Sequence, residues 1–201
     1  MTGRQVQKQR TTKETSISLR LDVDGTGQAT VATGLPFFDH MISQLGRHSG
    51  FDLELRAQGD LAVDAHHTVE DVGIVLGEAL HEALGDKAGV RRFASMSVTL
   101  DEALVEVALD LSGRPFLLYD VDPGAGGEAY PLGDPPFDPQ LAEEFWRAFC
   151  TSAAITLHIT MRRGRNTHHI LEASFKSVAR ALRDAVRVEG VGVPSTKGVL
   201  G

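Results

Sequence analysis

Short segments of alternating apolar and polar residues recur along the chain, and this alternation is typical of strands with one buried face. In the first half, residues 17–23 and 51–55 alternate in this way. A glycine-containing turn at 24–27 follows the first segment, and residues 28–33 can return beside it as its hairpin partner. In the second half the strand-like segments are 98–100, 105–111 and 155–161. We therefore expect strands in both halves.

Four other segments carry apolar residues at helical spacing, namely 37–45, 64–84, 141–149 and 166–188. Asp64 and Asn166 are the predicted N-caps of the two long helices, because their side-chain oxygens can accept hydrogen bonds from free backbone N–H groups. Gly85 is a predicted stop signal. Residues 122–139 hold five of the eight prolines and predict a long surface loop or a linker between halves.

The order of strands and helices occurs twice, which indicates an internal repeat. Each long helix begins with His-His-x-x-Glu, and a shorter helix before it carries a further metal-ligating residue type. The first half supplies His40, His66, His67 and Glu70, and the second supplies Glu144, His168, His169 and Glu172. We expect two duplicated halves, residues 1–90 and 91–201, that together form one compact unit.

The spacing within this motif suits metal binding. Helix residues three or four apart share a face, so each glutamate can join a histidine of its own motif on one ion. Adjacent histidines diverge by about 100° around the axis, so one helix can serve two ions. Imidazole with carboxylate suits manganese, iron or zinc, not calcium or magnesium. One copy would also fit a plain surface helix start, but two copies at equivalent places favour metal.

Composition narrows the functional class. The chain has 201 residues and a formal net charge of −7, which argues against a general nucleic-acid binder. Its one cysteine, Cys150, lies in an apolar run and is expected to be a small core residue. A single cysteine excludes an intrachain disulfide and favours the cytoplasm. No stretch approaches the ~18–20 apolar residues of a membrane span.

Taken together, several segments of the sequence resemble the imidazoleglycerol-phosphate dehydratase family along nearly the whole chain. The segments are Lys13-Glu14-Thr15, Phe37-Phe38-Asp39-His40-Met41, the run from Asp64 to Asp71, Asp110-Leu111-Ser112-Gly113-Arg114-Pro115, Asn166-Thr167-His168-His169, and Val193-Pro194-Ser195-Thr196-Lys197-Gly198. The resemblance implies an α+β fold of the ribosomal protein S5 domain 2-like class, with two similar halves that each pair a small mixed sheet with helices.

The resemblance also implies two manganese ions per active site. The implied ligands are His40, His66, His67, Glu70, His168, His169 and Glu172. Many family members have histidine where this chain has Glu144. Either Glu144 replaces that ligand or the site lacks it, and the repeat, which pairs Glu144 with His40, favours replacement.

The implied reaction is the metal-dependent dehydration of imidazole glycerol phosphate to imidazole acetol phosphate in histidine biosynthesis. The ring, bound as imidazolate, would help expel the neighbouring hydroxyl. Glu14 is the candidate acid/base at the glycerol hydroxyls, with Asp101 or a metal-bound water as alternatives, and His67 and Glu172 are also expected to be catalytic. The substrate-binding set is Glu14, Arg92, Arg114, Lys176, Ser195 and Lys197, of which all but Glu14 are expected around the phosphate. Lys176 also fits a plain helix ion pair with Glu172.

Related enzymes assemble into shells of twenty-four chains with active sites between subunits, so we expect a homo-oligomer. Two other functional classes remain open. A metallohydrolase has weak support, because His-Glu-x-x-His is absent. A non-catalytic metal-storage shell accepts the ligands but leaves Glu14 and the cationic residues unexplained.

Overall fold

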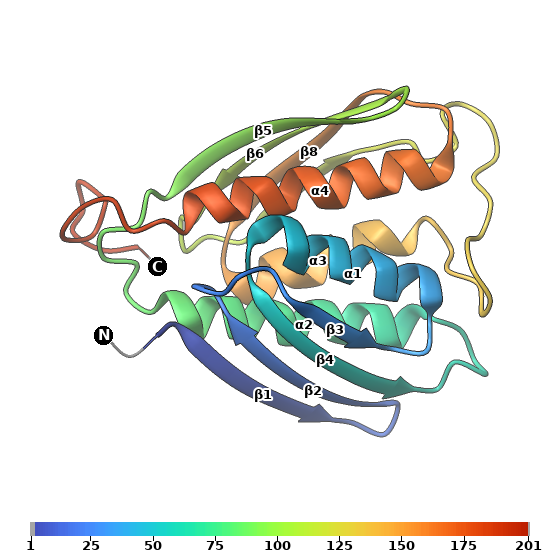
Figure 1. The fold of residues 1–201 in the computed structure, drawn as a ribbon, viewed down its shortest axis with the longest axis horizontal. Coiled ribbons are helices and arrows are strands. Elements are labelled where there is room, and N and C mark those ends of the chain that lie inside the picture. Colours follow the sequence, from blue (N-terminus) through green and yellow to red (C-terminus); the bar gives the residue numbers. More distant parts are fainter. Residues whose placement is uncertain (1–2, 201) are drawn as a thin grey trace.

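The computed structural model describes residues 3–200, and residues 1, 2 and 201 lie outside it. Two four-stranded mixed sheets enclose the helices (Figure 1). The first contains β1 (Gln5–Thr11), β2 (Thr15–Asp22), β3 (Ala29–Ala32) and β4 (Asp52–Gly59). The second contains β5 (Phe93–Leu100), β6 (Ala103–Asp110), β7 (Phe116–Asp120) and β8 (Thr156–Arg163).

The two sheets share one topology, which confirms the duplication. Their orders are β1-β2-β4-β3 and β5-β6-β8-β7. In each sheet the first three strands of that order pair antiparallel, and the last is parallel to its neighbour. A helix makes each parallel crossover: α1 (Pro36–Ser49) joins β3 to β4, and α3 (Leu141–Ala153) joins β7 to β8. The α+β class and the repeat are therefore as expected.

The long helices α2 (His66–Leu84) and α4 (Thr167–Ala185) follow β4 and β8. Helices α1 and α2 contact the first sheet, and α3 and α4 contact the second. Between the two helical layers, α1 packs against α4 and α2 against α3. The apolar core thus continues from one half into the other, and each helix pair takes one member from each half.

Helices α2 and α3 approach closely because two glycines of α2 face α3. A Cβ added at Gly73 would lie 2.7 Å from the carbonyl oxygen of Phe145, and one at Gly77 would lie 2.6 Å from that of Phe149. Trp146, Phe149 and Phe175 are almost fully buried in the same region. This contact fixes how the start of α2 lies relative to α3, which carries Glu144.

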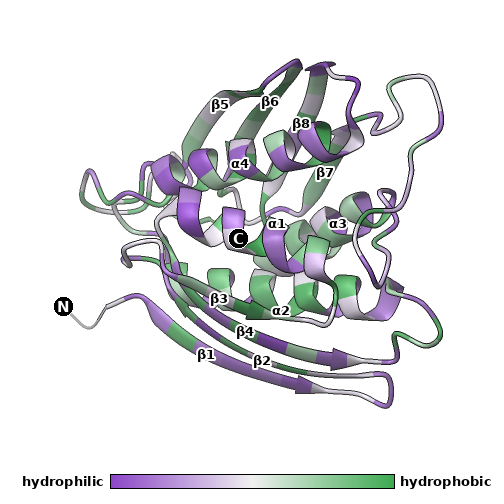
Figure 2. Cartoon of the chain, turned by 45° about the vertical axis from the view of Figure 1, so that its right-hand side comes forward, coloured by the Kyte–Doolittle hydropathy of each residue, from purple (hydrophilic) through white to green (hydrophobic). Residues whose placement is uncertain are grey.

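One sequence-based expectation about strands is wrong, and two strands were not predicted. Residues 28–33 are not the hairpin partner of 17–23, because β3 pairs with β4 in parallel and β1 occupies the free edge of β2. Strand β1 gave no alternation signal, because it is mostly hydrophilic (Figure 2) and Val6 is its one buried residue. Likewise β7 was not expected, so 122–139 is a loop between β7 and α3 within the second half and not a linker between halves.

Helix ends were predicted more closely. Asn166 caps α4, where its side chain accepts from the His169 N–H at 3.2 Å, and Gly85 ends α2 in a positive-φ conformation. Asp64 is not the N-cap, because α2 begins at His66 after Ala65. Its carboxylate still accepts from the His66 N–H at 2.8 Å. Helix α4 ends at Ala185, short of the predicted residue 188. None of the helices within residues 3–200 has the length and apolar character of a membrane span.

Candidate metal and phosphate sites

One group of potential metal ligands forms where α1 meets α4. His40, His168 and Glu172 each offer a ligand atom, and these three atoms all lie within 4.8 Å of one another. Oε2 of Glu172 lies 2.8 Å from Nε2 of His168 and 3.2 Å from Nε2 of His40. Two atoms bound to the same metal ion through bonds of about 2.0–2.2 Å lie at distances from each other similar to these. The group therefore has the size and donor types of a metal site.

Electrostatics hold Glu172 in its charged form. Burial by itself would raise the pKa of this carboxyl group, but hydrogen bonds from Lys176, His168 and His40 outweigh it and bring the pKa to about 2. Nζ of Lys176 lies 2.6 Å from Oε1, so the two carboxylate oxygens have different partners. Glu172 is thus an ionised ligand candidate whose Oε2 is directed at the histidines.

The first motif has a looser arrangement at the start of α2. Nε2 of His66 lies 4.0 Å from Oε2 of Glu70, and both side chains are close to half exposed. His66 and Glu144 line one hollow together with Leu35 and Pro135. Phe37, two residues after Leu35, contacts the His168 ring at 5.2 Å between centroids. The start of α1 therefore links the two ligand groups, although among residues 3–200 only the α1–α4 group brings three ligands together.

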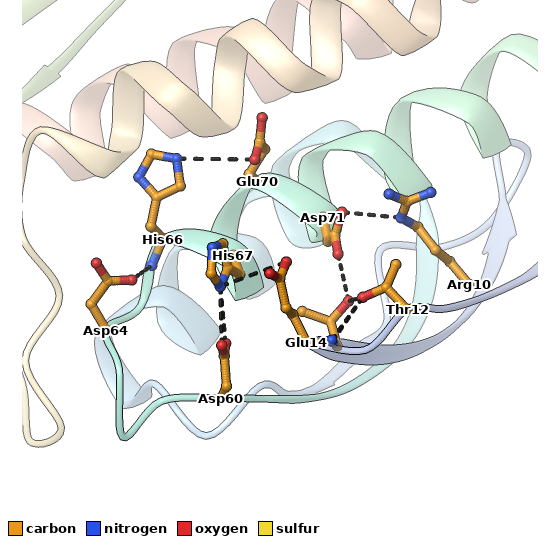
Figure 3. A network of polar contacts seen from close by, with 10 residues as sticks. Arg10, Thr12, Glu14, Asp60, Asp64, His66, His67, Glu70 and Asp71 are labelled. Carbon is orange, nitrogen blue, oxygen red and sulfur yellow. Dashed lines mark hydrogen bonds and ion pairs between the residues drawn. The ribbon is translucent and has the colours of Figure 1, made fainter.

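The second histidine of the first motif faces two carboxylates (Figure 3). Nδ1 of His67 lies 3.1 and 3.2 Å from the two carboxylate oxygens of Asp60, and 3.8 Å from Oε2 of Glu14. The Asp60 hydrogen bond raises the pKa of His67, against a smaller desolvation effect, and Glu14 adds to the increase. Glu14 and His67 are therefore brought together, as the catalytic hypothesis requires.

The turn that carries Glu14 is fixed to α2 by hydroxyl groups. Oγ1 of Thr12 accepts from the N–H groups of Glu14 and Thr15 at 3.1 and 3.0 Å. The Thr15 hydroxyl donates to Asp71, whose other carboxylate oxygen accepts from Nε of Arg10 at 3.0 Å. Asp71 is almost fully buried and directly follows Glu70 in α2. Figure 3 shows this network connecting the Glu14 turn to the motif helix.

The second histidine of the other motif also has a carboxylate partner. Nδ1 of His169 lies 2.8 Å from Oε2 of Glu102, in the β5–β6 turn, and its Nε2 lies 3.8 Å from Oδ2 of Asp101. The hydrogen bond with His169, together with backbone N–H groups that include that of Asn166, lowers the pKa of Glu102 to about 2. His169 therefore has one ring nitrogen occupied by a charged acceptor.

A separate cationic groove lies where the C-terminal segment meets the second sheet. Its lining includes Arg92, Arg114, Ser195 and Lys197, four of the five residues expected around a phosphate. Arg92 is held by a bidentate pair with Asp110 at 2.7 and 3.1 Å, and its remaining nitrogen donates to the Pro194 carbonyl at 2.8 Å. The arginine thus positions the tail that carries Ser195 and Lys197.

Lys176 does not belong to this groove. It lies on α4 beside Glu172, so the helix ion pair considered from the sequence is formed. Two other histidines have local partners: Nε2 of His48 contacts Oε1 of Gln44 at 3.0 Å, and Nδ1 of His81 contacts the Ala153 carbonyl at 3.3 Å. Neither takes part in a ligand group.

Sequence reasoning missed Asp60 and Glu102 as histidine partners and Asp71 as the anchor of the Glu14 turn. Asp60 belongs to none of the sequence motifs, and Asp71 is only the last residue of the run that begins at Asp64. Glu102 directly precedes β6 as Glu14 directly precedes β2. The repeat could therefore have identified Glu102, had the turns been aligned as well as the helices.

Comparison with known proteins identifies the family of the chain. A family model described as imidazoleglycerol-phosphate dehydratase matches residues 33–182. The enzyme of that name from Acidothermus cellulolyticus is 57% identical, over 98% of this chain and 93% of the relative. The one from Methanopyrus kandleri is 51% identical, over 95% of this chain and 94% of the relative.

Solved structures give the same result. The imidazoleglycerol-phosphate dehydratase of Staphylococcus aureus matches with a TM-score of 0.79 and 38% identity, covering 92% of this chain and 99% of its own. That of Pyrococcus furiosus matches with a TM-score of 0.80 and 37% identity, covering 96% and 100%. The chain therefore belongs to the imidazoleglycerol-phosphate dehydratase family.

Proposed function

We propose that this protein dehydrates imidazole glycerol phosphate to imidazole acetol phosphate in histidine biosynthesis, with two manganese ions in each active site. The group formed by His40, His168 and Glu172 is the observation that carries the metal assignment. Membership of the family supports the substrate and the lyase reaction. That biosynthetic role in turn supports a cytoplasmic location.

The donor set fits manganese. Imidazole nitrogens combined with ionised carboxylates suit a divalent transition metal, and Glu172 remains charged at neutral pH. We assign one ion to His40, His168 and Glu172, and the second to His66, Glu70 and Glu144, with His67 and His169 completing the ligand sets. Glu144 occupies the position in the second half that His40 occupies in the first. Glu144 also lines the same hollow as His66, and both observations support Glu144 as a ligand.

Residues of the chain perform the proton transfers. When bound, the two ions supply positive charge at the imidazole ring of the substrate and lower the pKa of its N–H group. Glu14, exposed and 3.8 Å from Nδ1 of His67, is our acid/base for the carbon-bound proton and the leaving hydroxyl. Asp101, near His169, is the alternative. The Thr12 and Asp71 contacts hold the Glu14 turn in place.

The cationic groove is our phosphate-binding site. Guanidinium, ammonium and hydroxyl donors bind phosphate through charge-assisted hydrogen bonds. Arg92, Arg114, Ser195 and Lys197 provide these groups in one hollow. Lys176 neutralises Glu172 within the chain, so its contact with the phosphate requires the substrate to reach from the groove to α4.

The active site is completed between subunits in this proposal, within a homo-oligomer of twenty-four chains. Its support is the incompleteness of the second group within one chain. His66 and Glu70 are 4.0 Å apart with side chains 43% and 47% exposed, so they are open to ligands from a neighbour. Metal that bridges subunits couples assembly to metal loading.

The experiment that tests the proposal is an assay of imidazole acetol phosphate formation by metal-stripped protein, with and without added manganese. We expect turnover only with manganese. Glu172→Gln should lower manganese content and kcat together, because it removes an ionised donor. Glu78→Gln, on the exposed face of α2, serves as the control. A fully metallated assembly without turnover would instead support metal storage.

A further inference from the structure

The second histidine of each motif directs Nδ1 at a carboxylate that lies outside the assigned ligand set. His169 faces Glu102 at 2.8 Å, and His67 faces Asp60 at 3.1 Å. We propose that Glu102 and Asp60 are positioning residues, which keep the proton of each histidine on Nδ1 and present its Nε2 to manganese. This inference rests on the proposed function, because it requires His67 and His169 to be ligands.

The chemistry of imidazole makes such a partner necessary. A neutral ring carries one proton, and a metal binds only the nitrogen without it. A carboxylate at Nδ1 holds the proton there, fixes the ring orientation and makes Nε2 more basic. Both histidine side chains are about one-third exposed, so without a partner each ring could turn or exchange tautomers.

Glu102 is built into the start of α4. Its Oε1 accepts from the backbone N–H groups of Arg165 and Asn166 at 3.1 and 2.8 Å, while Oε2 accepts from Nδ1 of His169. Asn166 is also the N-cap of that helix. One carboxylate therefore fixes both the backbone before the motif and the ring within it.

The two halves divide this task differently. Glu14 and Glu102 each directly precede the second strand of a hairpin, and each lies near the second histidine of its half. Glu102 is in hydrogen-bond contact with its histidine, whereas Glu14 remains 3.8 Å away. Asp60, at the end of β4, takes the Nδ1 position in the first half. Because Asp60 rather than Glu14 contacts Nδ1 of His67, Glu14 remains available for the substrate.

This geometry predicts an unusual effect of Glu102→Gln. The two backbone N–H donors would keep the amide oxygen, so the amide NH₂ would face His169. Nδ1 would then have to accept, and the proton would move to Nε2, where it blocks metal. Asp60→Asn should be milder, because both Asp60 oxygens face Nδ1 and the amide can present its oxygen. Asp60→Ala removes the acceptor altogether.

The test is a manganese titration of the metal-stripped full chain, with free Mn²⁺ followed by electron paramagnetic resonance. We expect Glu102→Gln and Asp60→Ala each to weaken one class of sites by about 10–100-fold, the range for lost outer-shell partners. Excess manganese should restore kcat in both variants but not in His169→Ala. Glu106→Gln, which removes a carboxylate paired with Arg162 on the exposed surface of the same sheet, is the matched control.

Wild-type affinity in both Glu102→Gln and Asp60→Ala would overturn the inference, as would an equal loss in Glu106→Gln. If Glu102→Gln does not fold, as judged by circular dichroism, Asp60→Ala decides, since Asp60 holds no helix backbone through its side chain. His67→Ala and His169→Ala distinguish a wrong ligand assignment from wrong positioning roles. If they bind manganese as the wild type does, the ligand assignment in the proposed function is at fault, rather than the positioning roles.

Discussion

At the scale of single residues, several carboxylates of this chain accept hydrogen bonds at turns and helix starts. Glu102 holds the start of α4, Asp71 holds the Glu14 turn, and Asp64 accepts from the first N–H of α2. Asp52 belongs to the same class: its Oδ1 accepts from the N–H groups of Thr26 and Gln28 at 2.8 and 2.9 Å. The same interaction, a carboxylate that accepts hydrogen bonds, thus holds both the candidate site and an ordinary turn in place.

Asp52→Asn offers a test of that device away from the active site. Backbone hydrogen bonds from Gln28 and Thr26 lower the pKa of Asp52, so its charged form stabilises the fold above the unfolded-state pKa of about 3.9. The variant keeps a carbonyl acceptor but loses the charge, and we expect it to be about 1 kcal/mol less stable at pH 7.

Urea unfolding at fixed protein concentration measures this difference between pH 7 and pH 3. The difference should shrink as the pH falls below about 4 towards the lowered pKa of Asp52, because the wild-type carboxylate is then protonated. A difference that stays constant over this range would show that the charge is not responsible.

At the scale of elements, helix pairing across the halves builds the site. His40 comes from α1 and meets His168 and Glu172 of α4, while His66 of α2 shares a hollow with Glu144 of α3. Both pairings follow from the packing of α1 on α4 and of α2 on α3. The glycines of α2 set the closeness of the second pair.

Gly73→Ala and Gly77→Ala should therefore both destabilise the protein, by about 1–3 kcal/mol each, because the added methyl group overpacks the α2–α3 contact. Helix propensity alone predicts the opposite sign, a gain of about 1 kcal/mol. Glu78→Ala on the exposed face of α2 is the control and should change stability little. Thermal or urea unfolding gives the sign, and stabilisation by either glycine variant would contradict the close contact.

At the scale of the whole molecule, the two halves share one interior. Each helix pair takes one member from each half, so we propose that residues 1–90 and 91–201 form one folding unit. Within residues 3–200, only the α1–α4 group brings three candidate ligands together. In our proposal a neighbouring subunit completes the second group, so bound metal would contribute to assembly as well as to the reaction.

Removing manganese with a chelator should consequently dissociate the assembly into smaller species, since ligands from different subunits would no longer share an ion. Mass photometry at constant protein concentration measures the change, and added manganese should reverse it. Magnesium is the control and should not, because imidazole ligands do not suit it. An assembly unaffected by complete metal removal would contradict metal bridging between subunits.

The sequence by itself determined the duplicated α+β fold, the positions of the four helices and the residue types of the ligand groups. These features depend on local periodicity, capping and motif spacing, which are properties of neighbouring residues. The edge strands β1 and β7 lack that periodicity and could not be predicted, because β1 is mostly polar and β7 is an almost continuous apolar run. The pairing of β3 with β4 depends on a crossover that no local pattern records.

Tertiary structure alone decided which candidate ligands meet. The repeat predicted that His40 and Glu144 are equivalent, but the packing of α1 on α4 decided that His40 joins the motif of the other half. It also brought Asp60 and Glu102 to the second histidines. Such contacts join residues that are far apart in the chain, and they form only where buried apolar helix faces fix the distance between elements.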